Sequence, residues 1–93
     1  SKMSLTAAIL NGDYEKALQL WLEAYKASSD IHDTETEGEA CSQLGLIYSR
    51  LSNFTKALDY FNKGLEIRED LGDENAVASS LNRIGMVLRQ TKR

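Results

Sequence analysis

Apolar and polar residues follow one another along this chain with the spacing of helices. Between positions 40 and 65, apolar side chains recur every three or four residues in two runs, separated by a short polar break at Ser52-Asn53. Each run contains a small residue, Gly45 in the first and Ala57 in the second, where two helix backbones can come close. The stretch therefore predicts an antiparallel helical hairpin at the centre of the fold.

The same spacing predicts further helices on both sides of this hairpin. We expect helices over 4–10, from 14 to about 27, from about 37 to 51, over 54–71 and over 74–90. Residues 28–37 are polar and acidic and are expected to form a frayed helix end and a connection. Thr36 and Glu39 have the spacing of a capping box, which would start the next helix near Glu37. The chain has no proline, and this favours long helices joined by tight turns.

Each predicted helix has one apolar face, which we expect to be buried. Trp21 is the expected anchor of the face on the helix that starts at position 14. The residues expected to point inward are Ala17, Leu18, Trp21, Ala24 and Tyr25; Ala40, Cys41, Leu44, Ile47, Tyr48 and Leu51; Phe54, Ala57, Leu58, Phe61, Leu65 and Leu71; and Leu81, Ile84, Val87 and Leu88.

The chain also aligns with itself at a shift of 40 residues without a gap. Asp13-Tyr14 falls on Asn53-Phe54, Trp21 on Phe61, Asp33 on Asp73, and Leu44-Gly45 on Ile84-Gly85. The complete unit resembles the tetratricopeptide repeat family, whose motif is matched by Leu44, Gly45, Tyr48, Ala57, Phe61 and Gly64. The usual period of that family is about 34 residues. The longer period is similar to repeats of Leu-Gly-Asn-type adaptors and of bacterial signalling proteins.

This resemblance implies an all-α fold in which antiparallel helical hairpins, about five helices in all, stack as a short right-handed superhelix. The chain would form a single domain with a partial first repeat at 1–33, a complete repeat at 36–71 and the first helix of a truncated third repeat at 74–93. Members of the family bind other proteins, so the resemblance implies a scaffold without enzymatic activity, with a regulatory role within a larger signalling protein.

In the family, the first helices of successive repeats line a concave groove. The positions that face it correspond here to Glu39, Ser42, Gln43, Leu46, Ser49 and Arg50, and to Ser79, Asn82, Arg83, Met86, Arg89 and Gln90. Among them, the expected partner-binding residues are Gln43, Leu46, Arg50, Asn82, Arg83, Met86 and Arg89. Arginines pair with carboxylates through two parallel hydrogen bonds, so an acidic peptide or helix is the expected ligand. The alternative is that this face is only solvated.

A second hypothesis is self-association. If the last helix has no partner helix, its apolar residues Leu81, Ile84, Val87 and Leu88 are partly uncovered, and a second copy of the chain could cover them as a homodimer.

Composition argues against several other functions. The 93 residues are 42% hydrophobic and carry a net charge of −3, which fits a globular protein and gives no clustered basic surface for nucleic acid. No apolar run is long enough for a membrane span, so we expect a cytoplasmic protein. Cys41 is expected to act as a small buried hydrophobe, and His32, in an acidic segment, as a solvated residue. We therefore predict no catalytic residue, metal or cofactor.

Overall fold

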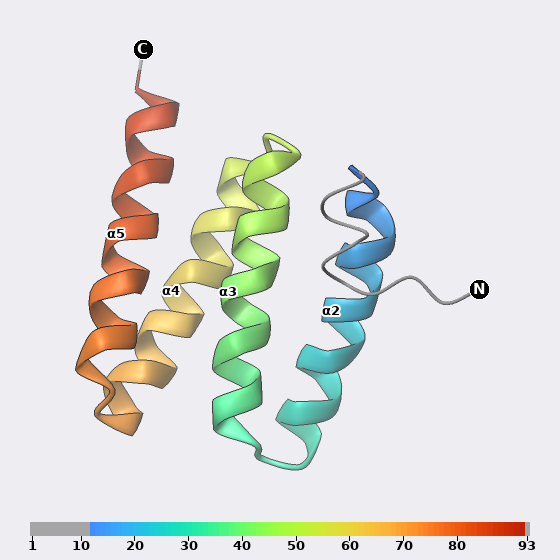
Figure 1. Cartoon of the computed structure of the whole chain (residues 1–93), viewed down its shortest axis with the longest axis vertical. Coiled ribbons are helices and arrows are strands. Elements are labelled where there is room, and N and C mark those ends of the chain that lie inside the picture. The colour runs from blue at the N-terminus through green and yellow to red at the C-terminus, as the bar shows by residue number, and fades with distance from the viewer. Residues whose placement is uncertain (1–11, 93) are drawn as a thin grey trace.

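The structure, a computed structural model, describes residues 12–92 and contains four helices in that part of the chain. They are α2 (Tyr14–Asp30), α3 (Thr34–Arg50), α4 (Phe54–Leu71) and α5 (Glu74–Thr91). Successive helices run in opposite directions and are joined by short turns (Figure 1). The all-α prediction is confirmed. The helix expected at 4–10 lies outside the described residues, and the handedness of the superhelix stays a prediction.

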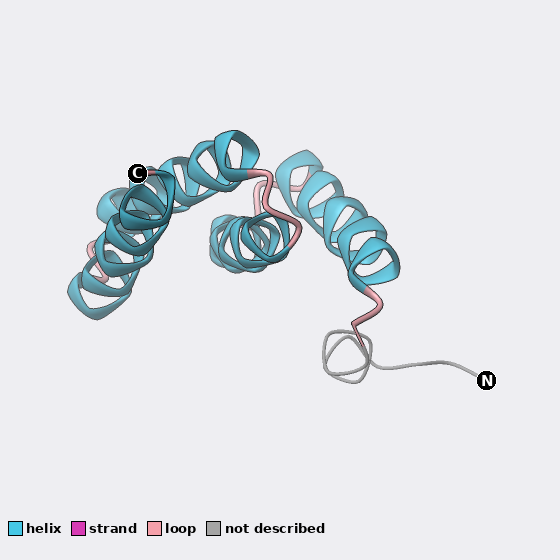
Figure 2. Cartoon of the chain, turned by 90° about the horizontal axis from the view of Figure 1, so that it is seen from above, coloured by secondary structure: helices cyan, strands magenta, loops and turns pink. Residues whose placement is uncertain are grey.

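The helices are arranged as a stack with α3 in its interior. Seen from above, α3 has α2 on one side and α4 and α5 on the other (Figure 2). Contacts between helices join α2 to α3, α3 to α4 and α4 to α5. The hairpin of α3 and α4, predicted from the stretch 40–65, is therefore the centre of the described fold.

All three turns between the helices are built in the same way. The second-last turn residue has a positive φ, at His32 (58°), Ser52 (61°) and Gly72 (72°). The next residue is an Asp or Asn that caps the following helix through its side chain. Its backbone N–H also donates to a carbonyl five residues earlier, as from Asp33 to Ser28 at 2.8 Å. Because each turn reverses the chain in two or three residues, the helices begin every 20 positions, and two of them make the 40-residue period.

The prediction of a long connection at 28–37 is therefore wrong. Residues up to Asp30 belong to α2, and α3 already begins at Thr34. The capping box is also wrong, because Asp33 is the N-cap and its carboxylate accepts both the Thr36 N–H (3.3 Å) and the Thr36 hydroxyl (2.6 Å). A carboxylate at the cap satisfies the free backbone donors of the first turn, so Glu39 is not needed there.

The core confirms most of the predicted inward faces. One cluster combines Tyr48, Ala57, Phe61 and Val87, and a second combines Ala17 and Ile47, with Trp21 half-buried at its edge. Ala40, Cys41 and Leu44 are fully buried as well.

Four leucines predicted to point inward are instead largely exposed. Leu51 is the C-cap of α3 and Leu71 is the last residue of α4, and at these helix ends their side chains stay 41% and 46% exposed. Leu81 and Leu88 are 54% and 48% exposed because α5 turns a different side toward α4, with Ser80 and Val87 buried. The apolar face of α5 was therefore assigned correctly for Val87 and for the half-buried Ile84, and wrongly for the two leucines.

Candidate functional site

A hollow of about 170 Å³ lies between α3 and α5, and α4 forms its floor. Phe61 of α4 is the floor residue, while Leu46 and Ser49 of α3 form one wall. Asn82, Arg83, Met86 and Val87 of α5 form the other wall. We call it the α3–α5 hollow; its lining is mostly apolar, with the polar groups at its walls.

A second hollow, of about 150 Å³, lies between α2 and α3. It is lined by Tyr14, Gln43, Leu46, Ile47 and Arg50, and we call it the α2–α3 hollow. Leu46 belongs to both hollows, so they lie on the two sides of one half-buried side chain. The helical register explains this, because positions 43, 46 and 50 fall on one side of α3.

Six of the seven residues predicted to bind a partner line one of these hollows: Gln43, Leu46, Arg50, Asn82, Arg83 and Met86. Arg89 lines neither, and its guanidinium lies beside Gly85 on another side of α5. Within residues 12–92, neither Arg50 nor Arg83 has a carboxylate within ion-pair distance. The two hollows therefore each have a cation whose charge is not neutralised by the described chain.

The other groove positions behave differently from one another. Ser49 lines the α3–α5 hollow and donates a long hydrogen bond of 3.5 Å to Gln90 Oε1, which links α3 to α5. Ser79 is exposed. Ser42 is buried and does not face the groove. Glu39 is engaged in the polar cluster described next.

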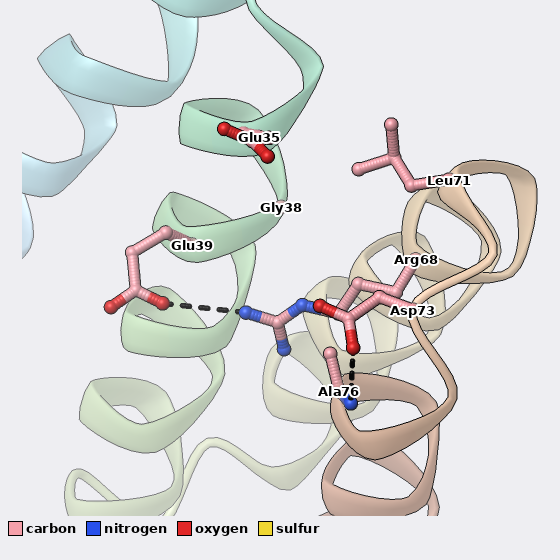
Figure 3. Close-up of a pocket in the computed structure, with 7 residues that line it drawn as sticks. All are labelled: Glu35, Gly38, Glu39, Arg68, Leu71, Asp73 and Ala76. Atoms are coloured by element: carbon pink, nitrogen blue, oxygen red, sulfur yellow. Dashed lines mark hydrogen bonds and ion pairs between the residues drawn. The ribbon is translucent and has the colours of Figure 1, made fainter.

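Sequence reasoning missed a buried polar cluster around Arg68. Its guanidinium donates to the hydroxyl of Ser42 on α3 and, at 3.3 Å, to that of Ser80 on α5. It also forms an ion pair with Glu39 Oε2 at 3.3 Å, the one ion pair among the described residues (Figure 3). The Arg68 side chain is 15% exposed, whereas that of Glu39 is 53% exposed. One side chain of α4 thus joins α3 to α5.

The Arg68 cluster borders a cavity of about 290 Å³ at the end of the stack where α4 turns into α5. Leu71 at the end of α4, Asp73 in the turn and Ala76 at the start of α5 line one side of it, and Glu35 and Gly38 of α3 line the other (Figure 3). Asp73 is engaged as the cap of α5, through a bond of 3.1 Å from the backbone N–H of Ala76. Since the arginine is already bonded to three side chains, the cavity offers no free cation and is a structural feature.

A second missed feature is a group of tyrosines between α2 and α4. Tyr60 stacks on Tyr48 and meets Tyr25 edge-on, with ring centroids 5.7 Å apart in both pairs. The ammonium group of Lys63 lies 5.1 Å from the Tyr60 ring centre, in a cation–π contact. Burial raises the pKa of Tyr25 and of Tyr60, with Cys41 and Glu37 adding to the effect at Tyr25, and Tyr48 at Tyr60. The spacing of the aromatic residues and the lysine along the helices was the sequence signal from which this group could have been predicted.

Cys41 and His32, the two residues considered as candidate catalytic or metal-binding groups, lie in environments that do not favour either role. Burial, with a smaller contribution from the charge of Glu37, raises the pKa of the Cys41 thiol to about 11, so the thiol is protonated at neutral pH. His32 is exposed in the turn between α2 and α3. Across residues 12–92 there is no group of three or more His, Cys, Asp or Glu side chains placed to hold a metal ion. None of the described helices combines the length and apolar character that crossing a bilayer requires.

The residues predicted for self-association lie on two sides of α5. Leu81 and Leu88 are on the exposed side, with Ile84 half-buried at its edge. Val87 is only 2% exposed and packs in the cluster with Tyr48, Ala57 and Phe61. Its side chain is therefore used within the chain and is not available to a second copy.

Comparison with known proteins agrees with the repeat seen in the sequence. A profile described as tetratricopeptide repeat matches residues 5–70 and, in a second overlapping match, residues 39–93. No match was found among curated proteins. The two profile matches together span nearly the whole chain, and the helical hairpin with Gly45 against Phe61 has the geometry that the motif residues implied. Repeats of this kind generally mediate protein–protein interactions and are typically not enzymes. The chain belongs to the tetratricopeptide repeat family.

Proposed function

We propose that the chain is a protein-interaction scaffold that binds a peptide or a helix across the α2–α3 and α3–α5 hollows. The observation that carries this proposal is the pair of adjoining apolar hollows that share Leu46, each with an arginine that has no acidic partner in the described chain. A ligand that spans Leu46 would place one apolar side chain in each hollow.

The chemistry of the walls indicates what the ligand carries. Arg50 and Arg83 favour carboxylates, which a guanidinium binds through two parallel hydrogen bonds. The side-chain amides of Gln43 and Asn82 can both donate and accept, as binding of a peptide backbone requires. We therefore expect a segment with two apolar residues and at least one Asp or Glu.

The similarity of residues 65–88 to repeats of bacterial signalling proteins supports a regulatory role in the cytoplasm, within a larger signalling protein. In that setting the hollows would hold a segment of a signalling partner, and the scaffold itself would contribute no chemistry.

Peptide display followed by titration tests the proposal. Peptides selected on the wild-type chain should be rich in acidic and apolar residues, and their affinity should fall with added salt. Arg83→Glu should weaken the selected peptides about 10-fold or more, because an attractive contact becomes a repulsive one. Lys26→Glu makes the same change in charge at an exposed site on α2 that lines neither hollow, and should have little effect.

Two results would contradict the groove. One is a set of selected peptides without carboxylates. The other is an equal loss of affinity in the Arg83 and Lys26 variants, which would mean that the peptides respond only to the net charge of the chain.

Self-association is a second candidate function. It is favoured by the exposed leucines of α5, Leu81 and Leu88, which no helix of the described chain covers. Its residues are Leu81, Ile84 and Leu88. The test is the molar mass in solution at increasing concentration, measured by light scattering, and a monomer mass at high micromolar concentration would exclude it.

A further inference from the structure

The outer side of α5 carries a regular pattern that the groove does not use. Glu74, Ala78, Leu81, Gly85, Leu88 and Lys92 follow one another at alternating steps of four and three residues. This is the heptad spacing of a helix that packs along a second helix. All of these positions are exposed except Gly85, which is partly exposed. α5 lies at the edge of the stack, with one long side facing no other helix of the described chain (Figure 1).

Gly85 forms a notch in this side of the helix. At the equivalent position one repeat earlier, a Cβ added to Gly45 would lie 2.4 Å from the Phe61 ring, which fills the space. A Cβ added to Gly85 would meet only Arg89 Nη1, at 3.9 Å. The space that an apolar side chain occupies at Gly45 is therefore open at Gly85, apart from one flexible arginine.

We propose that this face is a self-complementary interface, on which α5 packs antiparallel against α5 of a second copy with the two-fold axis near position 83. The proposal rests on the second candidate function and specifies its geometry. In this register, residues whose numbers add up to 166 lie side by side. Leu81 of each chain then enters the notch at the partner's Gly85, and Leu88 covers the partner's Ala78.

Charge at the two ends of the helix favours the same register. Glu74 at the first turn of α5 lies beside the partner's Lys92 just after the last turn, and the pair occurs twice in the dimer. Shifting the chains by one heptad step places Leu81 against the partner's Lys92, or leaves Leu88 beyond the partner's helix. A parallel pair would set Glu74 against the partner's Glu74. Of these arrangements, only the proposed antiparallel register covers the leucines, fills the notch at Gly85 and pairs Glu74 with Lys92.

A second copy therefore suits this face better than an unrelated helix does, because each feature finds its complement on the same six positions. A closed two-fold pair is also the commonest outcome for such a surface. The contact involves one helix of each chain, about 27 Å long at 1.5 Å per residue for 18 residues. We expect a weak dimer that forms at high protein concentration.

Disulfide trapping tests the register. Single variants E74C and K92C are prepared separately, and Cys41 does not compete because it is fully buried. Under mild oxidation, an equal mixture of the two variants should give a covalent dimer, and each variant alone should give little. Self-crosslinking of E74C alone would mean a parallel pair and would overturn the proposed register while leaving self-association in place.

Sedimentation equilibrium of Leu81→Glu tests the face. This substitution puts two carboxylates into the apolar centre of the dimer and should raise the dissociation constant at least about 100-fold. Leu81 is more than half exposed, so the variant is expected to fold, which circular dichroism checks. An unchanged dimer would exclude this face, and a wild-type chain that stays monomeric would overturn the proposal together with the second candidate function.

The groove is tested separately from this interface. Leu81 and Arg83 lie on opposite sides of α5 by helical spacing, so Leu81→Glu should leave the affinity for selected peptides unchanged. Charge exchange gives an independent check: E74K and K92E each repel their own copies, and together they should form a mixed dimer roughly 10-fold tighter than either homodimer.

Discussion

The contact between Gly45 and Phe61 gives the sharpest prediction about stability. A Cβ added to Gly45 would lie 2.4, 2.5 and 2.8 Å from Cε1, Cδ1 and Cζ of Phe61. Carbon atoms in contact prefer separations of about 3.5–4.0 Å. The ring would have to move by about 1 Å, yet it is only 3% exposed and is enclosed by the cluster of Tyr48, Ala57 and Val87. Gly45→Ala should therefore strain the hairpin of α3 and α4.

The expected magnitude follows from two opposing terms. Overpacking a core costs about 1–3 kcal/mol, and the close distances place this case at the upper end. Replacing glycine by alanine inside a helix contributes about 1 kcal/mol of stability. The net loss for Gly45→Ala is about 1–2 kcal/mol, or roughly 5–10 °C in Tm for a domain of this size. Thermal and urea unfolding followed by circular dichroism measure it.

Gly85 provides the matched control, because it occupies the same position in the next repeat. There an added Cβ has no atom closer than 3.9 Å, so Gly85→Ala should gain about 0.5–1 kcal/mol from helix propensity alone. The measurement is made at low protein concentration, where association through α5 is negligible. The same substitution is thus expected to have opposite signs at the two equivalent positions.

A double variant separates the steric explanation from others. Phe61→Leu removes the ring atoms that the new methyl group would meet, so Gly45→Ala should cost less in that background by at least about 0.5 kcal/mol. If both glycine variants change stability in the same direction, or if Phe61→Leu gives no relief, the packing explanation is refuted.

Three further predictions concern the polar cluster, the turns and the buried thiol. Arg68→Met should lower the free energy of unfolding by about 2–3 kcal/mol, because it leaves two buried hydroxyls without their partner. Glu39→Gln should lower it by less than about 1 kcal/mol, because Glu39 is half exposed. Urea unfolding compares the two variants, and equal losses would contradict the role of the cluster. Ser52→Gly should raise the free energy of unfolding by relieving a positive φ, and Gly72→Ala should lower it, each by about 1 kcal/mol; a loss of stability on Ser52→Gly would contradict the strained turn. The Cys41 thiol ionises near 9.0 when unfolded and near 11 when folded. The free energy of unfolding should therefore be reduced as pH rises from 9.0 to about 11, by about 2 kcal/mol, and Cys41→Ala should lose that part of the decline in urea titrations.

The fold could be predicted from the sequence because its signals are local and repeated. Asn53 and Asp73 cap α4 and α5, and the predicted bounds of both helices agree with the structure to within a residue. The turn at His32 was missed because a positive φ is uncommon outside glycine. Yet position 32 aligns with Gly72 at the 40-residue shift, and Asp33 aligns with Asp73. The repeat therefore contained the correct boundary, and the polar composition of 28–37 concealed it.

The groove was harder to predict than the fold. The resemblance to the family motif placed Leu46, Arg50 and Arg83 on the groove side of their helices, and the structure brings them to adjoining hollows. The position of Arg89 depended on how α5 is rotated about its own axis, which spacing within one helix does not determine. Two apolar stripes compete on α5, one through Ile84 and Val87 and the other through Leu81 and Leu88, and the sequence alone does not rank them.

Arg68 determines which of the two apolar stripes of α5 is buried. It falls on the buried stripe of α4, three turns after Ala57 and two after Phe61, so its guanidinium needs polar partners inside the stack. Ser80 on α5 is one such partner, and it is buried only when the stripe of Val87 faces α4. Turning α5 to bury Leu81 and Leu88 would carry the Ser80 hydroxyl away and leave the arginine short of a hydrogen bond, at a cost of about 1–3 kcal/mol. A charged residue on the core face of one helix thus selects which side the next helix buries, and the two leucines are left on the outer side of α5, where a second chain can reach them.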